Sequence, residues 1–569
     1  MAAAPVSYRH RLLAILLAGL AFRSLAALIL PPGYDESYYL FYGQHPALSY
    51  FDHPLATGLW SWLGNALGGS IVALRIPALL SYSLACGLLA EACRPIFGPR
   101  AALLAAGMAS LSPLLLVCGG LLLLPDAPLL LVAALLAWWL ARHPLSRPLG
   151  VAGALGLGMI LGALTLCKYQ SFLVLLSLLA IRLTQSLRSR RWRPGETLLV
   201  LLSWLAVSAP LWIWNARHGW VSFGFHAART THEVGFHPAG PPLLLISQLL
   251  LLFPPIALAL LRGLADGDGV AVGDGRLRAM DDGAAHAALA PGSAAAADEA
   301  GDAGGGLWDG DPAPGDSGTV RGQAGADAQA EFRQTLRWIV LPQLVFFLVL
   351  AGRMQVLQSW LVPAWWLALP LAAARLEPLW KAGDRGLRRT AWITTALVPA
   401  LCLLVVAHIR WGVASWLIPP GVDTSDQLVD SGELRRALRR DPVIWRALGE
   451  AEVIASNRYE LPGFLALALR GHSRAHYTAY GKDPRGFRFW AHEIDPGARR
   501  GVMYGFVGGD EPIATMRTPG HFRDLRPLGR VALSRGGRRS VELEFYSFTP
   551  AGESAGMATG VETMGGSGS

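Results

Sequence analysis

Residues 12–37 read LLAILLAGLAFRSLAALILPPGYDES, an apolar stretch of membrane-spanning length followed at once by the acidic pair Asp35 and Glu36. The hydrocarbon core of a bilayer, about 30 Å thick, is crossed by a helix of about 20 mainly apolar residues. Charged side chains beside such a core are costly, and where they occur they usually serve a function. The stretch therefore predicts a membrane helix that ends at a chemically active loop outside the membrane.

The composition places most of the chain in the membrane. Of the 569 residues, 53% are hydrophobic and only 16% are charged. A soluble domain carries about 25% charged residues, so the chain is predicted to be a polytopic membrane protein. The net charge of +9 does not indicate nucleic acid as a partner, because the basic residues gather in short loops between apolar runs. The five cysteines lie in or beside apolar runs without metal-site spacing and are expected to pack as small apolar side chains.

Apolar runs of membrane-spanning length recur along the chain, and they predict a mainly α-helical transmembrane bundle of about eleven spans. The runs cover residues 12–31, 71–92, 101–122, 126–141, 149–166, 169–186, 197–214, 241–261, 336–352, 359–375 and 390–408. If the N-terminus is cytoplasmic, the arginine-rich loops at 188–193 and 381–389 also fall inside, as the positive-inside rule requires. A cleaved signal peptide at the first run is disfavoured, because Arg23 interrupts it and more spans follow.

The chain divides into five regions by composition. These are an N-terminal transmembrane catalytic region at 1–263 with a first periplasmic loop at 32–70, a disordered cytoplasmic insertion at 264–331, the remaining transmembrane helices at 332–410, a small periplasmic α/β domain at 411–550 and a disordered tail at 551–569. The insertion and the tail contain too few large apolar side chains to form a core. In the α/β domain, VMYGFV and VELEFYSF are typical of strands, and a helix is predicted near 431–448.

On this topology the outer face collects the polar and aromatic residues that are candidates for chemistry. They are Asp35, Glu36, Asp52, His53, Asp126, Lys168, Trp214, Asn215, Arg217, Arg353 and Trp360. Cations at headgroup depth suit a lipid phosphate, which makes Lys168 a candidate for binding it. Arg75, at the outer end of the second run, needs either a carboxylate or a ligand phosphate as its partner.

Structural alternatives stay open for several of these residues. Lys168 at the head of a span could simply extend its ammonium group to the membrane surface. Asp35 and Glu36 could cap and stabilise an interfacial helix that begins at Ser37, and Asp126 could be the N-cap of the next span. A lone histidine such as His53 is more often structural than catalytic.

The stretch YDESYYLFYGQHPALSYFDHP at residues 34–54 resembles the membrane glycosyltransferases of the GT-C superfamily, in particular the bacterial branch of protein O-mannosyltransferase-like and lipid A aminoarabinose transferase-like enzymes. Further likenesses lie at 111–128, 166–170, 210–223, 357–366, 455–467 and 485–490. The resemblance implies an enzyme of the bacterial inner membrane. It would transfer a sugar from a polyprenyl-phosphate donor to a hydroxyl of a glycolipid, a polysaccharide or a protein on the periplasmic side.

The resemblance also implies roles for individual residues. Asp35 matches the catalytic base, Glu36 its supporting neighbour and Asp126 a second acidic position. Lys168 lies where such enzymes contact the donor phosphate, and from their outer position we add Arg75, Arg217 and Arg353 to that group. The predicted substrate contacts are Asp52, His53, Trp214, Asn215 and Trp360. A single displacement assisted by one base would invert the anomeric centre.

We expect no cofactor, because Lys168 and nearby arginines can balance the phosphate charge. The alternative is a divalent Mg or Mn ion held by Asp35, Glu36 and Asp126 with His53, since hard oxygen ligands suit these metals. A multispanning lipid or sugar transporter, or flippase, is the alternative function, and it would predict a charged site at the membrane midplane between repeats. A glycan-binding scaffold would leave the acidic pair without a role. Neither the sugar nor the acceptor follows from the sequence.

Overall fold

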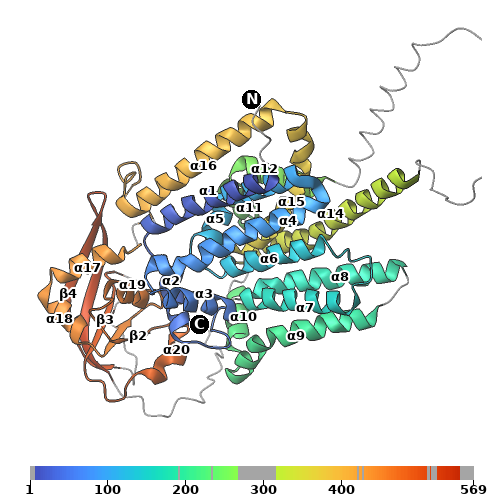
Figure 1. The fold of residues 1–569 in the computed structure, drawn as a ribbon. Coiled ribbons are helices and arrows are strands. Elements are labelled where there is room, and N and C mark those ends of the chain that lie inside the picture. Colours follow the sequence, from blue (N-terminus) through green and yellow to red (C-terminus); the bar gives the residue numbers. More distant parts are fainter. Residues whose placement is uncertain are drawn as a thin grey trace, which may run out of the picture.

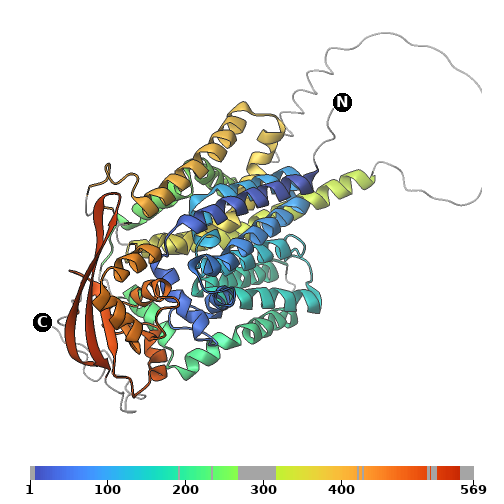
Figure 2. The ribbon, with the colours of Figure 1, turned by 60° about the vertical axis from the view of Figure 1, so that its left-hand side comes forward.

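The structure is a computed structural model that describes residues 7–189, 193–231, 235–266, 316–419, 422–423, 425, 428–508, 513 and 522–550. Long helices form a bundle, and a smaller domain with a β-sheet covers one end of it (Figures 1 and 2). The predicted fold class, a transmembrane helix bundle with a small C-terminal α/β domain, is confirmed.

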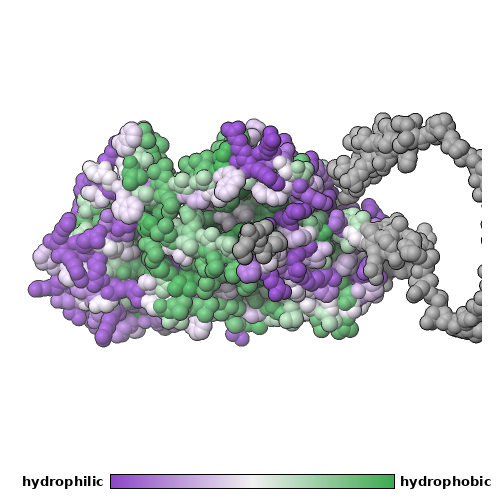
Figure 3. Space-filling model, turned by 45° about the horizontal axis from the view of Figure 1, so that its top comes forward, coloured by the Kyte–Doolittle hydropathy of each residue, from purple (hydrophilic) through white to green (hydrophobic). Residues whose placement is uncertain are grey.

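Every predicted apolar run lies on a helix of the bundle. The helices are α1 (Tyr8–Ile29), α4 (Ile71–Leu111), α5 (Pro113–Gly120), α6 (Asp126–Leu140), α7 (Gly150–Cys167), α8 (Phe172–Ser189), α9 (Pro194–Arg217), α11 (Gly240–Leu251), α12 (Pro254–Ala265), α14 (Asp316–Ala351), α15 (Val362–Lys381) and α16 (Arg385–Trp411). Among the described residues, seven helices are long and apolar enough to cross a membrane, or eight if the bent pair α11–α12 is one span. Figure 3 shows a broad band of hydrophobic side chains across the middle of the bundle, as a membrane-embedded belt requires.

Two helical segments are not straight spans. Helix α4 covers two predicted runs and turns at Gly98, whose φ of 87° is accessible to glycine at little cost. Helices α11 and α12 meet at a bend of 116°. The break falls at Phe253, with φ of 75°, directly before two prolines that start the next helix. The candidate span predicted over 241–261 therefore lies on two helices with a sharp bend between them.

Helix α14 begins inside the predicted unstructured insertion. It starts at Asp316, and Glu331 on it accepts hydrogen bonds from the backbone N–H and the hydroxyl of Ser146, at 2.7 and 2.6 Å. The predicted boundary at residue 331 is therefore wrong, because local composition does not register this packing. The rest of the insertion, residues 267–315, and the predicted tail at 551–569 lie outside the described residues.

The first loop outside the bundle forms two helices, α2 (Tyr34–Gln44) and α3 (Leu55–Ala66). Helix α2 begins where the Glu36 carboxylate accepts a hydrogen bond from the Gly33 N–H, at 3.0 Å. Its residues from Glu36 to Gly43 are all buried. The bundle covers one side of α2, and the C-terminal domain covers the other (Figure 1). The alternative that the acidic pair caps a helix is therefore confirmed for Glu36, but the helix begins at Tyr34 and not at Ser37, and it is buried.

The C-terminal domain is a mixed five-stranded sheet with short helices. Its elements are α17 (Ser431–Arg439), α18 (Pro442–Glu450), β1 (Val453–Ser456), α19 (Leu461–Ala468), β2 (His476–Ala479), α20 (Phe487–Trp490), β3 (Gly501–Phe506), β4 (Phe522–Arg535) and β5 (Arg538–Pro550), with strand order β2-β1-β3-β5-β4. Strand β1 pairs in parallel with β2 and β3, and the β3–β5 and β4–β5 pairs are antiparallel. The two predicted strands lie on β3 and β5. The one helix predicted at 431–448 is two, because Asp441 caps a new helix at Pro442.

Helix α19 fastens this domain to the bundle. The Ser37 hydroxyl donates a hydrogen bond to the Glu460 carbonyl at 2.6 Å, next to the start of α19. Gly463 of α19 lies so close to α2 that a Cβ atom there would be 1.9 Å from the Ser37 carbonyl oxygen. Glycine permits this close approach, and the domain thereby closes over the first loop.

Candidate active site

Asp35, in the first turn of α2, is an unpaired carboxylate in a charged environment. In the part of the chain that the structure describes, its carboxylate forms no hydrogen bond or salt bridge. Burial raises the pKa of Asp35 to about 6. Arg485 and Lys168 act to lower this pKa, and Asp52 and Glu460 act to raise it. These five residues define what we call the Asp35 site. A carboxylate with a pKa near neutrality and free oxygens can accept a proton from a substrate.

Glu36 has a different role from Asp35, because it forms a salt bridge with Arg75 on α4. Arg75 Nη2 and Nε donate to the two Glu36 oxygens at 2.7 and 2.9 Å, and both side chains are fully buried. The Leu123 N–H also donates to Glu36, at 2.9 Å. The other Arg75 N–H groups bond the carbonyls of Ala27, Leu30 and Pro31. With all five donors engaged, Arg75 has the carboxylate partner and offers no N–H to a phosphate.

Asp126 and Lys168 form a second buried pair. Lys168 Nζ donates to both oxygens of Asp126, at 2.9 and 3.0 Å, and the two side chains are 7% and 2% exposed. Lys168 follows α7 and Asp126 begins α6, so the pair joins the outer ends of these helices. An ammonium group has three donors, so one N–H of Lys168 is left for a ligand. The surface-seeking alternative for Lys168 does not hold, since the side chain is buried.

Asp52 is held by residues from three parts of the molecule. It accepts hydrogen bonds from Tyr42 on α2 and, at 2.9 Å, from Arg485 of the C-terminal domain. The His226 ring, on α10 (Val221–Thr231), lies 3.1 Å from the Asp52 carbonyl oxygen. Burial opposes ionisation of Asp52, but Arg485, His53 and Tyr42 together lower its pKa. Asp52 is therefore an ionised anchor of the loop rather than a proton acceptor.

His53 lies beside this anchor. Burial lowers its pKa to about 3, with Lys168 and Arg485 acting in the same direction and Asp52 against it. The ring packs edge-on against Tyr39, with 5.5 Å between centroids. Its Nδ1 atom is buried and has no hydrogen-bond partner among the described residues. A neutral imidazole with an open nitrogen can bind a hydroxyl group of a substrate.

A cavity of about 450 Å³ lies between the first loop, the end of α9 and the C-terminal domain. Its lining includes stacked pairs of rings, Trp214 on His218 at 4.1 Å and His45 on Trp490 at 4.4 Å. Arg217 lines it as well. Phe51 and Gly486 in its wall directly adjoin Asp52 and Arg485, so the cavity borders the Asp35 site. Aromatic faces with few charged groups are typical of a small-molecule site.

The other predicted residues are distributed differently. Asn215 is buried near the end of α9, where its Oδ1 atom has no partner among the described residues. Trp360 packs on Phe347 of α14, 5.7 Å between centroids, in a turn before α15. Arg353 is exposed in the loop after α14. The structure thus brings Asp35, Asp52, His53, Lys168 and Asp126 together, places Trp214 and Arg217 at the cavity, and keeps Arg353 at the surface.

Comparison with known proteins finds one family match and several similar solved structures. Residues 52–214 match the sequence model of the family described as dolichyl-phosphate-mannose-protein mannosyltransferase. The structure of ArnT from Cupriavidus metallidurans bound to undecaprenyl phosphate superposes with a TM-score of 0.54 at 15% identity, covering 94% of this chain and 97% of that one. The apo structure of the same ArnT gives a TM-score of 0.53 at 14% identity with the same coverage.

The chain has the fold of the GT-C glycosyltransferases. The S. cerevisiae Pmt1-Pmt2 complex bound to its sugar donor also matches, at 18% identity over 39% of this chain and 34% of that one, but its TM-score of 0.30 is too low to support an argument. No curated protein sequence matches the chain.

Within this GT-C fold, two of the three carboxylates considered as metal ligands, Glu36 and Asp126, are paired with cations. No group of three His, Cys, Asp or Glu side chains among the described residues could hold a metal ion. The reason lies in the pairing. Arg75 occupies Glu36, and Lys168 occupies both oxygens of Asp126, so Asp35 has no second free carboxylate beside it.

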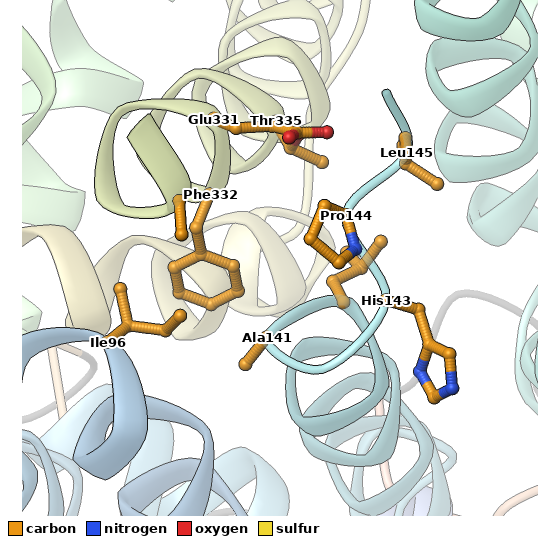
Figure 4. Close-up of a pocket in the computed structure, with 10 residues that line it drawn as sticks. Ile96, Ala141, His143, Pro144, Leu145, Glu331, Phe332 and Thr335 are labelled. Atoms are coloured by element: carbon orange, nitrogen blue, oxygen red, sulfur yellow. The ribbon is translucent and has the colours of Figure 1, made fainter. Parts of the chain in front are cut away.

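Among the described residues, the opposite end of the bundle offers no comparable site. The cavity there holds about 20 Å³ and is lined by the end of α6 and by α14, including His143, Glu331 and Phe332 (Figure 4). Helix α6 starts at Asp126 and ends at Leu140, about 22 Å along its axis, so this cavity is far from Asp35. About one water molecule would fill it.

The sequence did not predict Arg485 and Glu460 of the Asp35 site, nor Tyr42 and His226, which contact Asp52. Arg485 lies in RGFRFW, a segment whose likeness to the GT-C domain was noticed without a role for its first arginine. An arginine amid four apolar or aromatic neighbours is a weak signal of a buried cation. The pairing of Arg485 with Asp52, more than 400 positions away in the chain, arises only from domain packing.

Proposed function

We propose that this protein is a glycosyltransferase that moves a sugar from a polyprenyl-phosphate donor to an acceptor hydroxyl, with Asp35 as the catalytic base. The observation that carries the proposal is the difference in pairing among the carboxylates at this end of the bundle. Glu36, Asp126 and Asp52 each bond a cation, whereas Asp35 has free oxygens and a pKa of about 6. The GT-C fold and the match to a mannosyltransferase family support the reaction class.

In the proposed reaction, Asp35 accepts the proton of the acceptor hydroxyl while the oxygen of that hydroxyl forms a bond to the anomeric carbon of the donor sugar. The bond from that carbon to the phosphate oxygen breaks, and its electron pair leaves with the polyprenyl phosphate. Attack from the side opposite the phosphate inverts the anomeric centre. The uncommitted N–H of Lys168 is placed to stabilise the charge that grows on the leaving phosphate.

We propose that the acceptor enters through the 450 Å³ cavity beside the site. Its aromatic walls suit a sugar ring or a planar side chain, and Arg217 suits an anionic group on the acceptor. The loop distribution of basic residues favours a cytoplasmic N-terminus, which places the cavity and the C-terminal domain on the periplasmic side of a bacterial inner membrane.

We also propose that no cofactor is needed, since Lys168 and Arg485 already bring positive charge to the site. Turnover should then persist after chelation of divalent metals. Loss of turnover on chelation, restored by Mg or Mn, would favour the metal-dependent alternative instead.

The test uses the full chain in proteoliposomes with synthetic undecaprenyl phosphate carrying either mannose or aminoarabinose. We expect release of undecaprenyl phosphate from one of these donors, and a loss of about 10²- to 10⁴-fold in the Asp35→Asn variant, the range typical of a removed base. Glu450→Gln on α18, a carboxylate that is 56% exposed, serves as the control. Near-native turnover in a well-folded Asp35→Asn protein would refute the assignment of the base.

The same proteoliposomes distinguish a glycosyltransferase from the alternative, a transporter or flippase. A transporter would move the intact labelled donor across the vesicle membrane without breaking its sugar–phosphate bond. The charged residues of the Asp35 site lie in the first loop, directly after α7 and in the C-terminal domain, at one end of the bundle and not at its middle, which favours the transferase. Mass spectrometry of envelope glycolipids and glycoproteins, with and without the protein, would then identify the acceptor.

A further inference from the structure

We propose that Arg485 is a positioning residue through which the C-terminal domain completes the active site: it holds the first loop by Asp52 and places a compensating positive charge beside Asp35. This inference rests on the proposed role of Asp35 as the base. It assigns the C-terminal domain a direct part in catalysis, beyond covering the bundle.

The contacts of Arg485 are those of a buried, oriented guanidinium. Its Nη1 donates to Asp52 Oδ2 at 2.9 Å, with the two side chains 15% and 3% exposed. Its plane lies over the Tyr459 ring, 3.5 Å from the centroid, and its Nε bonds Asp483 at 3.2 Å. A stacked arginine that bonds two different carboxylates cannot be replaced by lysine without loss of geometry.

The backbone at this position is held in an uncommon conformation. Arg485 has φ of 45°, in the left-handed region that residues other than glycine rarely adopt. The next residue, Gly486, donates its N–H to the Tyr38 hydroxyl of α2 at 2.9 Å, and a Cβ there would lie 2.7 Å from the same oxygen. Such strain persists only where the surroundings fix it, and it is found at functional sites. The turn therefore directs Arg485 onto the first loop.

The charges around Asp35 give this arrangement a measurable consequence. The charged groups that face Asp35 are Arg485, Asp52, Glu460 and Lys168, from the C-terminal domain, the first loop and the start of η1 (Tyr169–Ser171). Arg485 has the largest influence among them and favours the ionised form of Asp35, whereas Asp52 opposes it. The two ends of one salt bridge thus act on Asp35 in opposite directions.

The experiment compares three single variants of the full chain in detergent, Arg485→Ala, Asp52→Asn and Arg488→Ala. Arg488 is an exposed arginine three positions away and is the matched control. The titration of Asp35 is followed by its labelling with a carbodiimide, which reacts with protonated carboxyl groups, between about pH 4 and pH 8. Peptide mass spectrometry quantifies the label at Asp35, so the readout does not require the donor to be known.

We expect Arg485→Ala to shift the labelling midpoint of Asp35 upward by about 1 pH unit, and Asp52→Asn to shift it downward. Arg488→Ala should leave it in place. With a donor that turns over, the acid limb of kcat against pH should move in the same directions. Arg485→Lys should keep the midpoint near that of the parent protein while kcat falls at least about tenfold, because the charge stays and the stacked fork is lost.

Equal shifts in Arg485→Ala and Asp52→Asn, or none in either, would overturn the inference and show a purely structural salt bridge. This result is distinct from failure of the proposed function, which would appear as normal turnover in Asp35→Asn whatever the labelling shows. If Arg485→Ala does not fold, as judged by gel filtration, the other two variants still test the inference. It requires a downward shift of the Asp35 labelling midpoint in Asp52→Asn and an unchanged midpoint in Arg485→Lys.

Discussion

The two ends of the helix bundle differ in how their charged side chains are buried and paired. At the end covered by the C-terminal domain, Arg75 and Glu36 form a fully buried pair at 2.7 Å beside the unpaired Asp35. At the other end, where α4 turns at Gly98 about 35 Å from Arg75, Arg100 and Glu377 approach only to 3.9 Å and are 56% and 24% exposed. The cavities differ in the same sense, about 450 Å³ against about 20 Å³.

This contrast shows that buried charges, which are costly for stability, are concentrated at the end that holds the proposed active site. Burying an ion pair requires strong geometry to offset the loss of hydration, whereas a surface pair costs and contributes little. At the first end, the buried pairs fix the backbone around Asp35, and Asp35 itself is left without a partner. The second end carries ordinary surface charges, and nothing among its described residues resembles a reaction site.

The largest effect on stability should come from Glu36→Gln. It removes the charge opposite Arg75 and leaves a buried guanidinium uncompensated, which costs about 3–5 kcal/mol. Thermal unfolding in detergent should therefore show a strong loss of stability, whereas Asp35→Asn, one residue earlier, should lose activity without such a loss. Equal stability of the two variants would contradict the division of roles between these neighbours.

The next effect concerns the closure of the C-terminal domain over the first loop. Gly463→Ala places a methyl group 1.9 Å from the Ser37 carbonyl oxygen and must push α19 away from α2. We expect a loss of about 1–3 kcal/mol in unfolding free energy, as for overpacked cores, and faster proteolysis between the bundle and the domain. Gly107→Ala in α4 is the control, because a Cβ there meets no atom within 4 Å and the backbone is helical. Parent-like proteolysis of Gly463→Ala would argue against tight docking.

A moderate effect is expected from pH. The raised pKa of Asp35, about 6, means that the base is ionised above this value and protonated below it. Activity should be fully present at about pH 8 and fall about tenfold for each pH unit below 6, equivalent to about 1.4 kcal/mol per unit. Initial rates with a fixed donor across this range would check it. An acid limb near pH 4, the ordinary range of an aspartate, would show that the surroundings do not perturb Asp35.

The smallest effect on stability and activity is expected at the end of the bundle that carries Arg100 and Glu377. Glu377→Gln removes a partly exposed pair with Arg100 and should change the unfolding free energy by less than about 1 kcal/mol and leave turnover unchanged. A large loss from this variant would remove the contrast between the two ends. The same thermal unfolding and turnover measurements serve as its check.

The sequence predicted the helices well, because a helix that crosses a bilayer needs a long apolar run, and such runs are visible in the sequence. It failed where a bend or a packing contact decides the outcome, as at Phe253 between α11 and α12 and at the start of α14. At the site, residue type and position identified Asp35, Asp126 and Lys168 as candidates. They did not indicate that Lys168 bonds Asp126, or that Arg75 saturates Glu36.

What the sequence determined by itself was the class of the protein, the apolar helices and the acidic pair after the first of them. These depend on local hydropathy and on the cost of charge near a membrane. Which carboxylate is left unpaired was decided only by the tertiary structure. Ion pairs form between side chains that the fold brings within about 3 Å, and Glu36–Arg75, Asp126–Lys168 and Asp52–Arg485 each join residues far apart in the chain.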